Sequence, residues 1–163
     1  MPVVSNTSPI SNLAISGRLD LLHEQLGEVL IPPAVETELL RHPLPKSLQR
    51  ITAAIESGRI RVEQLPRPVP EHLTALDPGE SEALALALEI KASRIVIDES
   101  LARRHAARLG LAHVGILGLL RHARRTGQID SLAEEISKLR AEARFFVSQS
   151  LEHRLLVSVG EAT

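Results

Sequence analysis

Short apolar segments alternate along this chain with longer segments that have helical periodicity. Apolar strands separated by helices are typical of a parallel sheet that is covered by helices on both faces. The candidate strands are Val3-Val4, 29–31, 59–62, 94–97 and 112–114. We therefore predict a single three-layer α/β domain. Residues 59–62 alternate between polar and apolar, which predicts a half-buried or edge strand.

The helical segments begin and end at residues with known preferences for helix ends. Ser8 and Pro9 predict a helix start with Ser8 as the N-cap, and Gly17 predicts the end of that helix. The segment 79–92 is apolar all round its middle, as expected for a buried helix. Further helices are predicted over 19–26, 34–41, 46–57, 101–109, 116–126 and 131–144, with a last one after Val147.

Composition excludes several classes of protein. The 163 residues suffice for one domain with a buried core. With 19 basic and 20 acidic residues the net charge is −1, which argues against a basic architectural DNA-binding protein and an acidic disordered tail. The absence of cysteine excludes disulfides, thiolate zinc sites and a cysteine nucleophile. Because there is neither a signal peptide nor an apolar run of roughly 20 residues, we expect a soluble, cytoplasmic protein with no membrane partner.

Polar residues directly follow two of the candidate strands. Asn6 and Thr7 come after the first strand, and Asp98 and Glu99 come after the fourth. In parallel sheets the active crevice lies beyond the carboxyl ends of the strands. If both strands are central, these residues open onto the same edge of the sheet.

Carboxylates near helix starts can join them. Glu38 belongs to the helix after Pro33, and Glu80 and Glu82 belong to the helix after Asp77. Together these residues would form an oxygen-rich cluster, the ligand set that Mg²⁺ and Mn²⁺ favour. A hard metal ion held by carboxylates can activate water and neutralise charge on a phosphodiester.

Four segments, in this order along the chain, resemble the motifs of PIN-domain proteins. They are Val4-Ser5-Asn6-Thr7-Ser8-Pro9-Ile10, then Ile31-Pro32-Pro33-Ala34-Val35 with Glu38-Leu39, then Leu76-Asp77-Pro78-Gly79-Glu80-Ser81-Glu82-Ala83, and finally Ile95-Val96-Ile97-Asp98-Glu99. Gly110-Leu111 and Gly115-Ile116-Leu117-Gly118 are similar to one prokaryotic branch of PIN-like proteins. The resemblance covers most of the chain, from about Val3 to Ile129.

This resemblance implies a Rossmann-like sheet and a Mg²⁺- or Mn²⁺-dependent ribonuclease site built from three or four acids. Many prokaryotic members are toxins that a partner antitoxin holds inactive. Carried onto this sequence, the acid positions fall on Asn6, Glu38, Glu82 or Glu80, and Asp98, with Thr7 as the hydroxyl neighbour of the first. Asn6 departs from the family, which usually has Asp there. An amide oxygen can ligate a hard cation but brings no negative charge, so metal affinity and catalysis should both fall.

Some of these residues also have a purely structural interpretation. Asn6 can be a turn residue that bonds its own backbone. Glu38 can be solvated, or paired with Arg41 three residues further on. Glu99 can simply be solvated. Asp98 is the strongest candidate, because a strongly apolar strand delivers it to the edge of the sheet.

The choice between Glu80 and Glu82 stays open. Glu80 can complete an acidic capping box that starts at Asp77. Glu82 has no such explanation and faces another side of the helix, so we prefer it as the metal ligand. Glu80 is then either a ligand or a residue that orients water.

Our first hypothesis is a PIN-like, metal-dependent endoribonuclease, the toxin of a toxin–antitoxin pair. Its metal ligands would be Asn6, Glu38, Glu82 and Asp98, assisted by Thr7, Glu80 and Glu99, and its RNA contacts would come from Arg103, Arg104 and Arg108. These arginines can equally form an ordinary solvated helix face. The second hypothesis is a catalytically degenerate PIN-like module that binds RNA or protein, because Asn6 replaces an acid. A third is a small α/β interaction module without metal.

The chain after position 129 exceeds what the sheet needs. We expect a PIN-like domain over 1–129 and a helical C-terminal extension over 130–163. Phe145 and Phe146, which are the only two aromatic residues, lie in this extension with several leucines. The extension can pack on its own domain or on a second copy of the chain, which would make the protein a homodimer.

Overall fold

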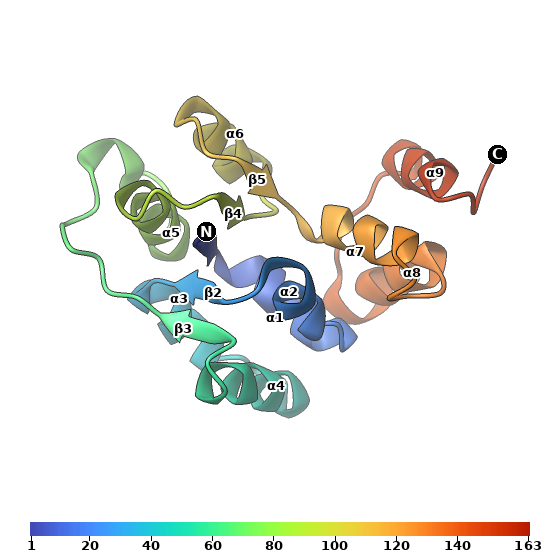
Figure 1. The fold of residues 1–163 in the computed structure, drawn as a ribbon, viewed down its shortest axis with the longest axis horizontal. Helices are drawn as coiled ribbons and strands as arrows, with labels where there is room; N and C mark the ends of the chain where they lie inside the picture. The colour runs from blue at the N-terminus through green and yellow to red at the C-terminus, as the bar shows by residue number, and fades with distance from the viewer.

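The computed structural model describes residues 1–163 and contains one five-stranded parallel sheet (Figure 1). Its strands are β1 (Val3–Ser5), β2 (Val29–Ile31), β3 (Ile60–Val62), β4 (Arg94–Val96) and β5 (His113–Val114). Their order in the sheet is β3-β2-β1-β4-β5, and every neighbouring pair is parallel. The predicted three-layer α/β fold is thus confirmed, with β1 at the centre and β3 at one edge.

Helices fill the segments between the strands, close to the predicted ranges. They are α1 (Thr7–Ser16), α2 (Asp20–Leu26), α3 (Pro33–Leu40), α4 (Pro45–Glu56), the 3₁₀ turn η1 (Glu71–Leu73), α5 (Pro78–Glu89), α6 (Ser100–Arg108), α7 (Ile116–Arg125), α8 (Leu132–Ala143) and α9 (Gln149–Ser158). None of these helices combines the length and apolarity that crossing a lipid bilayer requires.

The first helix starts earlier than the sequence suggested. It begins at Thr7 with Asn6 in the N-cap position, and Asn6 makes no side-chain capping bond. The prediction that Ser8 caps this helix is wrong, because the Ser8 hydroxyl donates instead to Oε1 of Glu99 at 2.8 Å. The Ser8 hydroxyl thus bonds to Glu99, which is distant in sequence, and is not used to cap the start of α1.

Alternate residues of each strand point into two separate hydrophobic clusters, as period-two strand geometry requires. On one face, Val3 and Val96 pack with α1, α2, α4, α7 and α8. On the other face, Val4 and Ile95 pack with α5 and α6. Because both faces are covered, the inner strands carry polar side chains only at their first or last residue.

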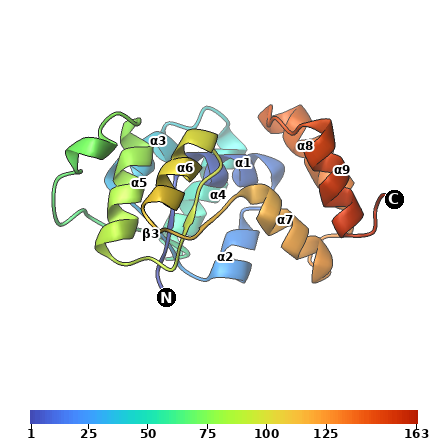
Figure 2. The ribbon, with the colours of Figure 1, turned by 90° about the horizontal axis from the view of Figure 1, so that it is seen from above.

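The C-terminal helices pack against the same chain. Leu132, Ile136 and Leu139 of α8 are buried in the cluster that contains Leu13 of α1. Both views place α8 and α9 together at the end of the molecule opposite α5 (Figure 1, Figure 2). Residues after 129 therefore enlarge the core of the domain on the α1 side.

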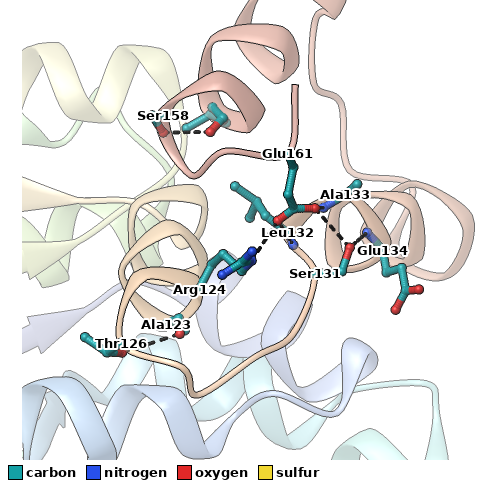
Figure 3. A network of polar contacts seen from close by, with 10 residues as sticks. Ala123, Arg124, Thr126, Ser131, Leu132, Ala133, Glu134, Ser158 and Glu161 are labelled. Atoms are coloured by element: carbon teal, nitrogen blue, oxygen red, sulfur yellow. Dashed lines mark hydrogen bonds and ion pairs between the residues drawn. The ribbon is translucent and has the colours of Figure 1, made fainter. Parts of the chain in front are cut away.

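The Glu161 side chain ties the chain end to α7 and α8 (Figure 3). Its carboxylate accepts the backbone N–H groups of Leu132 at 2.7 Å and Ala133 at 3.1 Å. It also accepts hydrogen bonds from Ser131 and from Arg124 of α7. Partial burial acts to raise the pKa of Glu161, but these donors outweigh it and hold that pKa below its ordinary value. Glu161 thus satisfies the free N–H groups at the start of α8.

We expect Glu161→Ala to lower the free energy of unfolding by about 1–3 kcal/mol, because buried N–H groups lose their acceptor. The folded-state pKa of Glu161 is lowered, so this stabilisation is present at neutral pH and is lost as pH falls through that pKa. Chemical denaturation at neutral and acidic pH measures both effects. Glu142→Ala, on the exposed part of α8, is the control and should change stability by less than about 0.5 kcal/mol. Equal losses in the two variants would contradict this role for Glu161.

Candidate active site

The carboxyl ends of β1 and β4 lie side by side at the centre of the sheet. Ser5 of β1 pairs with Val96 of β4, and the N–H of Asn6 donates to the carbonyl of Val96 at 3.0 Å. The chain moves outward from β1 through β2 to β3 and then returns to β4 on the other side, so this is the point at which strand order reverses. Ligands bind in the crevice at such a point.

Asp98 emerges at this point and carries a buried charge. Its Oδ1 accepts the N–H of Ile116, at the start of α7, at 2.9 Å. Its Oδ2 is buried and has no hydrogen-bond partner. Burial raises the pKa of Asp98 to about 6, although the Ile116 N–H and the charge of Arg103 oppose the rise. An unpartnered buried carboxylate oxygen costs stability unless a ligand satisfies it.

Glu38 reaches the same crevice from α3. Its Oε2 accepts the hydroxyl of Thr7 at 2.6 Å. Its carboxylate lies directly against Gly79, where a Cβ would meet Oε1 at 2.6 Å. The ion pair with Arg41 that helical spacing allowed is not formed, because Glu38 is held by Thr7 instead.

Three further carboxylates meet at the start of α5. Oxygens of Asp77, Glu80 and Glu99 all lie within 4.8 Å of one another. The predicted capping role of Asp77 is confirmed, since its Oδ1 accepts the N–H of Glu80 at 2.9 Å. Partial burial raises the pKa of Asp77, opposed by a backbone N–H bond from Gly79. Glu80 is buried, whereas Asp77 and Glu99 are exposed.

Glu38 and Glu99 are linked by two pairs of consecutive residues, one in α1 and one in α5, each of which contacts both acids. Thr7 and Ser8 of α1 donate to Glu38 and Glu99 respectively. Gly79 and Glu80 of α5 in turn touch Glu38 and approach Glu99. We call Glu38, Asp77, Glu80, Asp98 and Glu99 the acidic centre, although only Asp77, Glu80 and Glu99 have carboxylate oxygens within 4.8 Å of one another. None of the five forms an ion pair with a basic side chain.

Glu82 is not part of the group formed by the carboxylates of Asp77, Glu80 and Glu99. Its Oε1 accepts the N–H of Ala34, near the start of α3, at 3.2 Å. Ala34 contacts Glu82, and Glu38, later in α3, contacts Gly79, earlier in α5, so the two helices run antiparallel and Glu82 lies toward the other end of their contact. Residues two apart on a helix point about 200° apart, so Glu80 and Glu82 cannot share one position. The structure brings Glu80 into the cluster, and the preference for Glu82 as a metal ligand stays a prediction.

Asn6 is buried at 3 % exposure and makes no capping bond, so it is not a turn residue that satisfies its own helix. Arg103, Arg104 and Arg108 are exposed on α6, directly after Glu99. Of these, Arg103 is near enough for its charge to act on Asp98. Their predicted contact with RNA remains a prediction.

Two glycines and a serine were not singled out as site residues from the sequence. A Cβ on Gly115 would meet Oδ1 of Asp98 at 2.6 Å, as a Cβ on Gly79 would meet Glu38. Any larger residue would therefore displace a carboxylate. For Gly79 the available signal was its position next to Glu80, and for Gly115 it was the Gly115-Ile116-Leu117-Gly118 segment of the family resemblance. For Ser8 there was none beyond its position after Asn6 and Thr7.

The donor set fits a hard divalent cation. The acidic centre offers only carboxylate oxygens, without compensating basic groups, and one of these oxygens is buried and unpartnered. Mg²⁺ and Mn²⁺ prefer oxygen ligands of this kind.

A comparison with protein families supports this interpretation. The family model described as "DUF3368: PIN domain" matches residues 2–161. The chain belongs to the PIN-domain family. Searches of curated proteins and of solved structures gave no significant match. The PIN domain is a nuclease-type fold that generally uses divalent metals. The family match continues through α8 and α9, beyond position 129 where the sequence resemblance ended.

We expect the contribution of Asp98 to the stability of the metal-free PIN domain to fall as pH rises from about 4 to about 7. The folded-state pKa of Asp98 is raised, so the folded protein binds more protons than the unfolded chain in this range. The rise from 3.8 to about 6 corresponds to at most about 3 kcal/mol. Asp98→Asn should remove this contribution, because its amide is neutral at every pH. Denaturation in EDTA across this range measures the difference, and parallel curves for the two proteins would contradict the buried charge.

Proposed function

We propose that the protein is a metal-dependent endoribonuclease that cleaves RNA phosphodiesters in the cytoplasm. The observation that carries the proposal is the unpartnered Oδ2 of Asp98, which is buried where strand order reverses in a PIN domain. The other four acids of the acidic centre form no ion pairs with basic side chains. Such a site disfavours every anionic ligand unless a cation is bound first.

Asp98, Glu80, Glu99 and Glu38 would hold Mg²⁺ or Mn²⁺, and Asn6 would add a neutral amide oxygen. When bound, such an ion lowers the pKa of water to make a nucleophile and neutralises charge on the phosphodiester. We propose Glu80 in place of Glu82 as the acid from α5, since Glu80 approaches Glu99 while Glu82 accepts the N–H of Ala34.

The remaining residues orient these carboxylates. The hydroxyls of Thr7 and Ser8 each hold one oxygen of an acid by donating to it. The Ile116 N–H donates to Oδ1 of Asp98 and fixes its position. Oδ2 has no partner and is the oxygen that remains available as a metal ligand. Arg103, with Arg104 and Arg108 further along α6, would attract the RNA backbone toward the acidic centre.

A second candidate function is binding of RNA or protein without cleavage. Asn6 supports it, because a buried amide replaces the carboxylate usual in PIN domains and removes one negative charge from the site. This second function would use the same fold and the basic residues of α6, but it predicts no cleavage of RNA. Metal-dependent cleavage separates the two functions.

We further propose the finer assignment of a toxin that an antitoxin protein holds inactive, and that the chain forms a homodimer. Their support is the sequence resemblance together with one exposed aromatic side chain. Phe146 is 87 % exposed beside α8, whereas Phe145 packs against the core. Large exposed aromatic side chains are favoured at interfaces between chains.

The direct test is cleavage of a structured RNA in Mn²⁺ and in EDTA. We expect wild-type cleavage in Mn²⁺ alone, and a loss of at least about 10- to 100-fold in Asp98→Asn and Glu80→Gln. Glu56→Gln, an exposed acid outside the site, should cleave like the wild type. Equal rates in Mn²⁺ and EDTA would refute the nuclease and favour the binding function. A larger loss in Glu82→Gln than in Glu80→Gln would return the ligand role to Glu82.

The toxin assignment predicts growth arrest when the wild-type chain is expressed alone in a bacterial host. Asp98→Asn should not arrest growth, because the metal site loses its central charge. Growth curves with matched expression, checked by immunoblot, measure the effect. Normal growth with the wild type, at a level that yields active nuclease, would contradict the toxin role and leave the nuclease standing.

A further inference from the structure

A groove leads away from the acidic centre along α1. Its first part is a cavity of 380 Å³ that is lined by Thr7 and Glu38 at one end. Its second part is a cavity of 830 Å³ at the far end of α1. Ile15 and Leu44 line both cavities, so the two parts adjoin at these residues.

Helix α1 forms the floor of this groove. Thr7, Ser11 and Ile15 line it and are spaced four residues apart, so they lie on one face of the helix. From Thr7 to Ile15 the floor extends about 12 Å, at 1.5 Å per residue. The connection between α3 and α4 lies along one side of the groove, and α8, through Lys138 and Glu142, lines the other.

The far end of the groove is basic. Lys46 and Arg50 of α4 and Lys138 of α8 line it, and none of the three forms an ion pair. Arg50 donates one hydrogen bond to the carbonyl of Ala14 and keeps its charge. The acidic side chain in this lining is Glu142. The groove thus joins a negative end, which suits a metal ion, to a positive end.

The start of α4 adds two features that point to an anion. The helix has 12 residues, and its N-terminus has neither a side-chain cap nor an acid in the first turn, which leaves N–H groups free. Ser47, the third residue of α4, lines the cavity at 2 % exposure, and its hydroxyl makes no hydrogen bond within the protein. The hydroxyl oxygen is not sealed off from the cavity, so it is free to donate to an anion bound there.

We propose that Lys46, Ser47, Arg50 and Lys138 form a subsite for a backbone phosphate of a single RNA strand. The strand would run along α1, with its scissile phosphodiester at the acidic centre and a phosphate a few nucleotides away at the basic end. This inference rests on the proposed function for the identity of the strand. Helix α8 thereby contributes to substrate binding as well as to the core.

Phosphate chemistry explains the combination of groups better than a carboxylate or a protein surface does. Free helix N–H groups, a hydroxyl and flexible lysines together match an anion with several acceptor oxygens. Glu142 at the rim opposes the binding of such an anion, so the subsite favours a ligand that is also held elsewhere. An RNA strand that also contacts the exposed Arg103 and Arg104 of α6 satisfies that condition, with or without a bound metal ion.

The experiment measures binding of a fluorescein-labelled 12-nucleotide single-stranded RNA by anisotropy in EDTA, so that neither metal nor cleavage contributes. We expect the double variant Lys46→Gln/Lys138→Gln to bind at least 10-fold more weakly than the wild type. The slope of log affinity against log salt should fall by about 0.7, the value for one phosphate on a single strand. Ser47→Ala should weaken binding several-fold with the slope unchanged.

The matched control is Lys91→Gln/Arg94→Gln, which removes the same charge from exposed positions after α5 and at the start of β4. It should change affinity less than twofold. Equal weakening by the two double variants would overturn the subsite, since only diffuse charge would then matter. Displacement of the RNA by inorganic phosphate below 1 mM would also overturn it, by assigning the site to free phosphate.

The readout separates this inference from the proposed nuclease. A protein that binds the RNA through Lys46, Ser47 and Lys138 but never cleaves it would refute the nuclease and keep the subsite. Mn²⁺-dependent cleavage with unchanged affinity in Lys46→Gln/Lys138→Gln would keep the nuclease and refute the subsite. Melting temperatures of all variants confirm that each is folded, and Ser47→Ala, which alters no charge, is the most specific single test.

Discussion

Parallel pairing of β1 with a neighbour on each side is the constraint on which this structure depends. Because β1 is central, its backbone is paired on both edges, and its side chains are buried on both faces. Only the residue at which the strand ends can then be polar and still reach a ligand. Asn6 occupies that position on β1, and Asp98 occupies it beyond the neighbouring β4. The site is a consequence of where the two apolar strands stop.

The buried, unpartnered oxygen of Asp98 and the close approach of Asp77, Glu80 and Glu99 lower stability, and the fold offsets part of the cost. Asp98 lies at the N-terminus of α7, and Glu38 lies against the N-terminus of α5, where the helix dipoles favour negative charge. Gly115 and Gly79 permit these close approaches, since a side chain at either position would occupy the space of a carboxylate oxygen. A bound divalent cation would neutralise the remaining negative charge of the acidic centre.

This nearly neutral protein has small groups of unpaired charges of one sign. The five acids of the acidic centre have no ion-pair partners, and unpaired basic groups lie on α6 and at the start of α4. The C-terminal helices take part in this arrangement, because α8 carries Lys138 at the edge of the groove. Glu161 accepts hydrogen bonds from the start of α8 and from Arg124 of α7. This contact near the end of the chain helps to fix the position of α8, which forms one side of the groove.

Local sequence was enough for the strands, the parallel sheet and the strand-end positions of Asn6 and Asp98, because those follow from apolar runs and from where they end. It was not enough to choose between Glu80 and Glu82. Both lie on one helix, and the way α5 packs against α3 decides which of them faces the other acids. Ser8 shows the same limit, since its preference for capping lost to Glu99, a partner 91 residues away. Periodicity is a property of neighbouring residues, whereas the convergence of carboxylates, glycines and hydroxyls depends on distances across the fold.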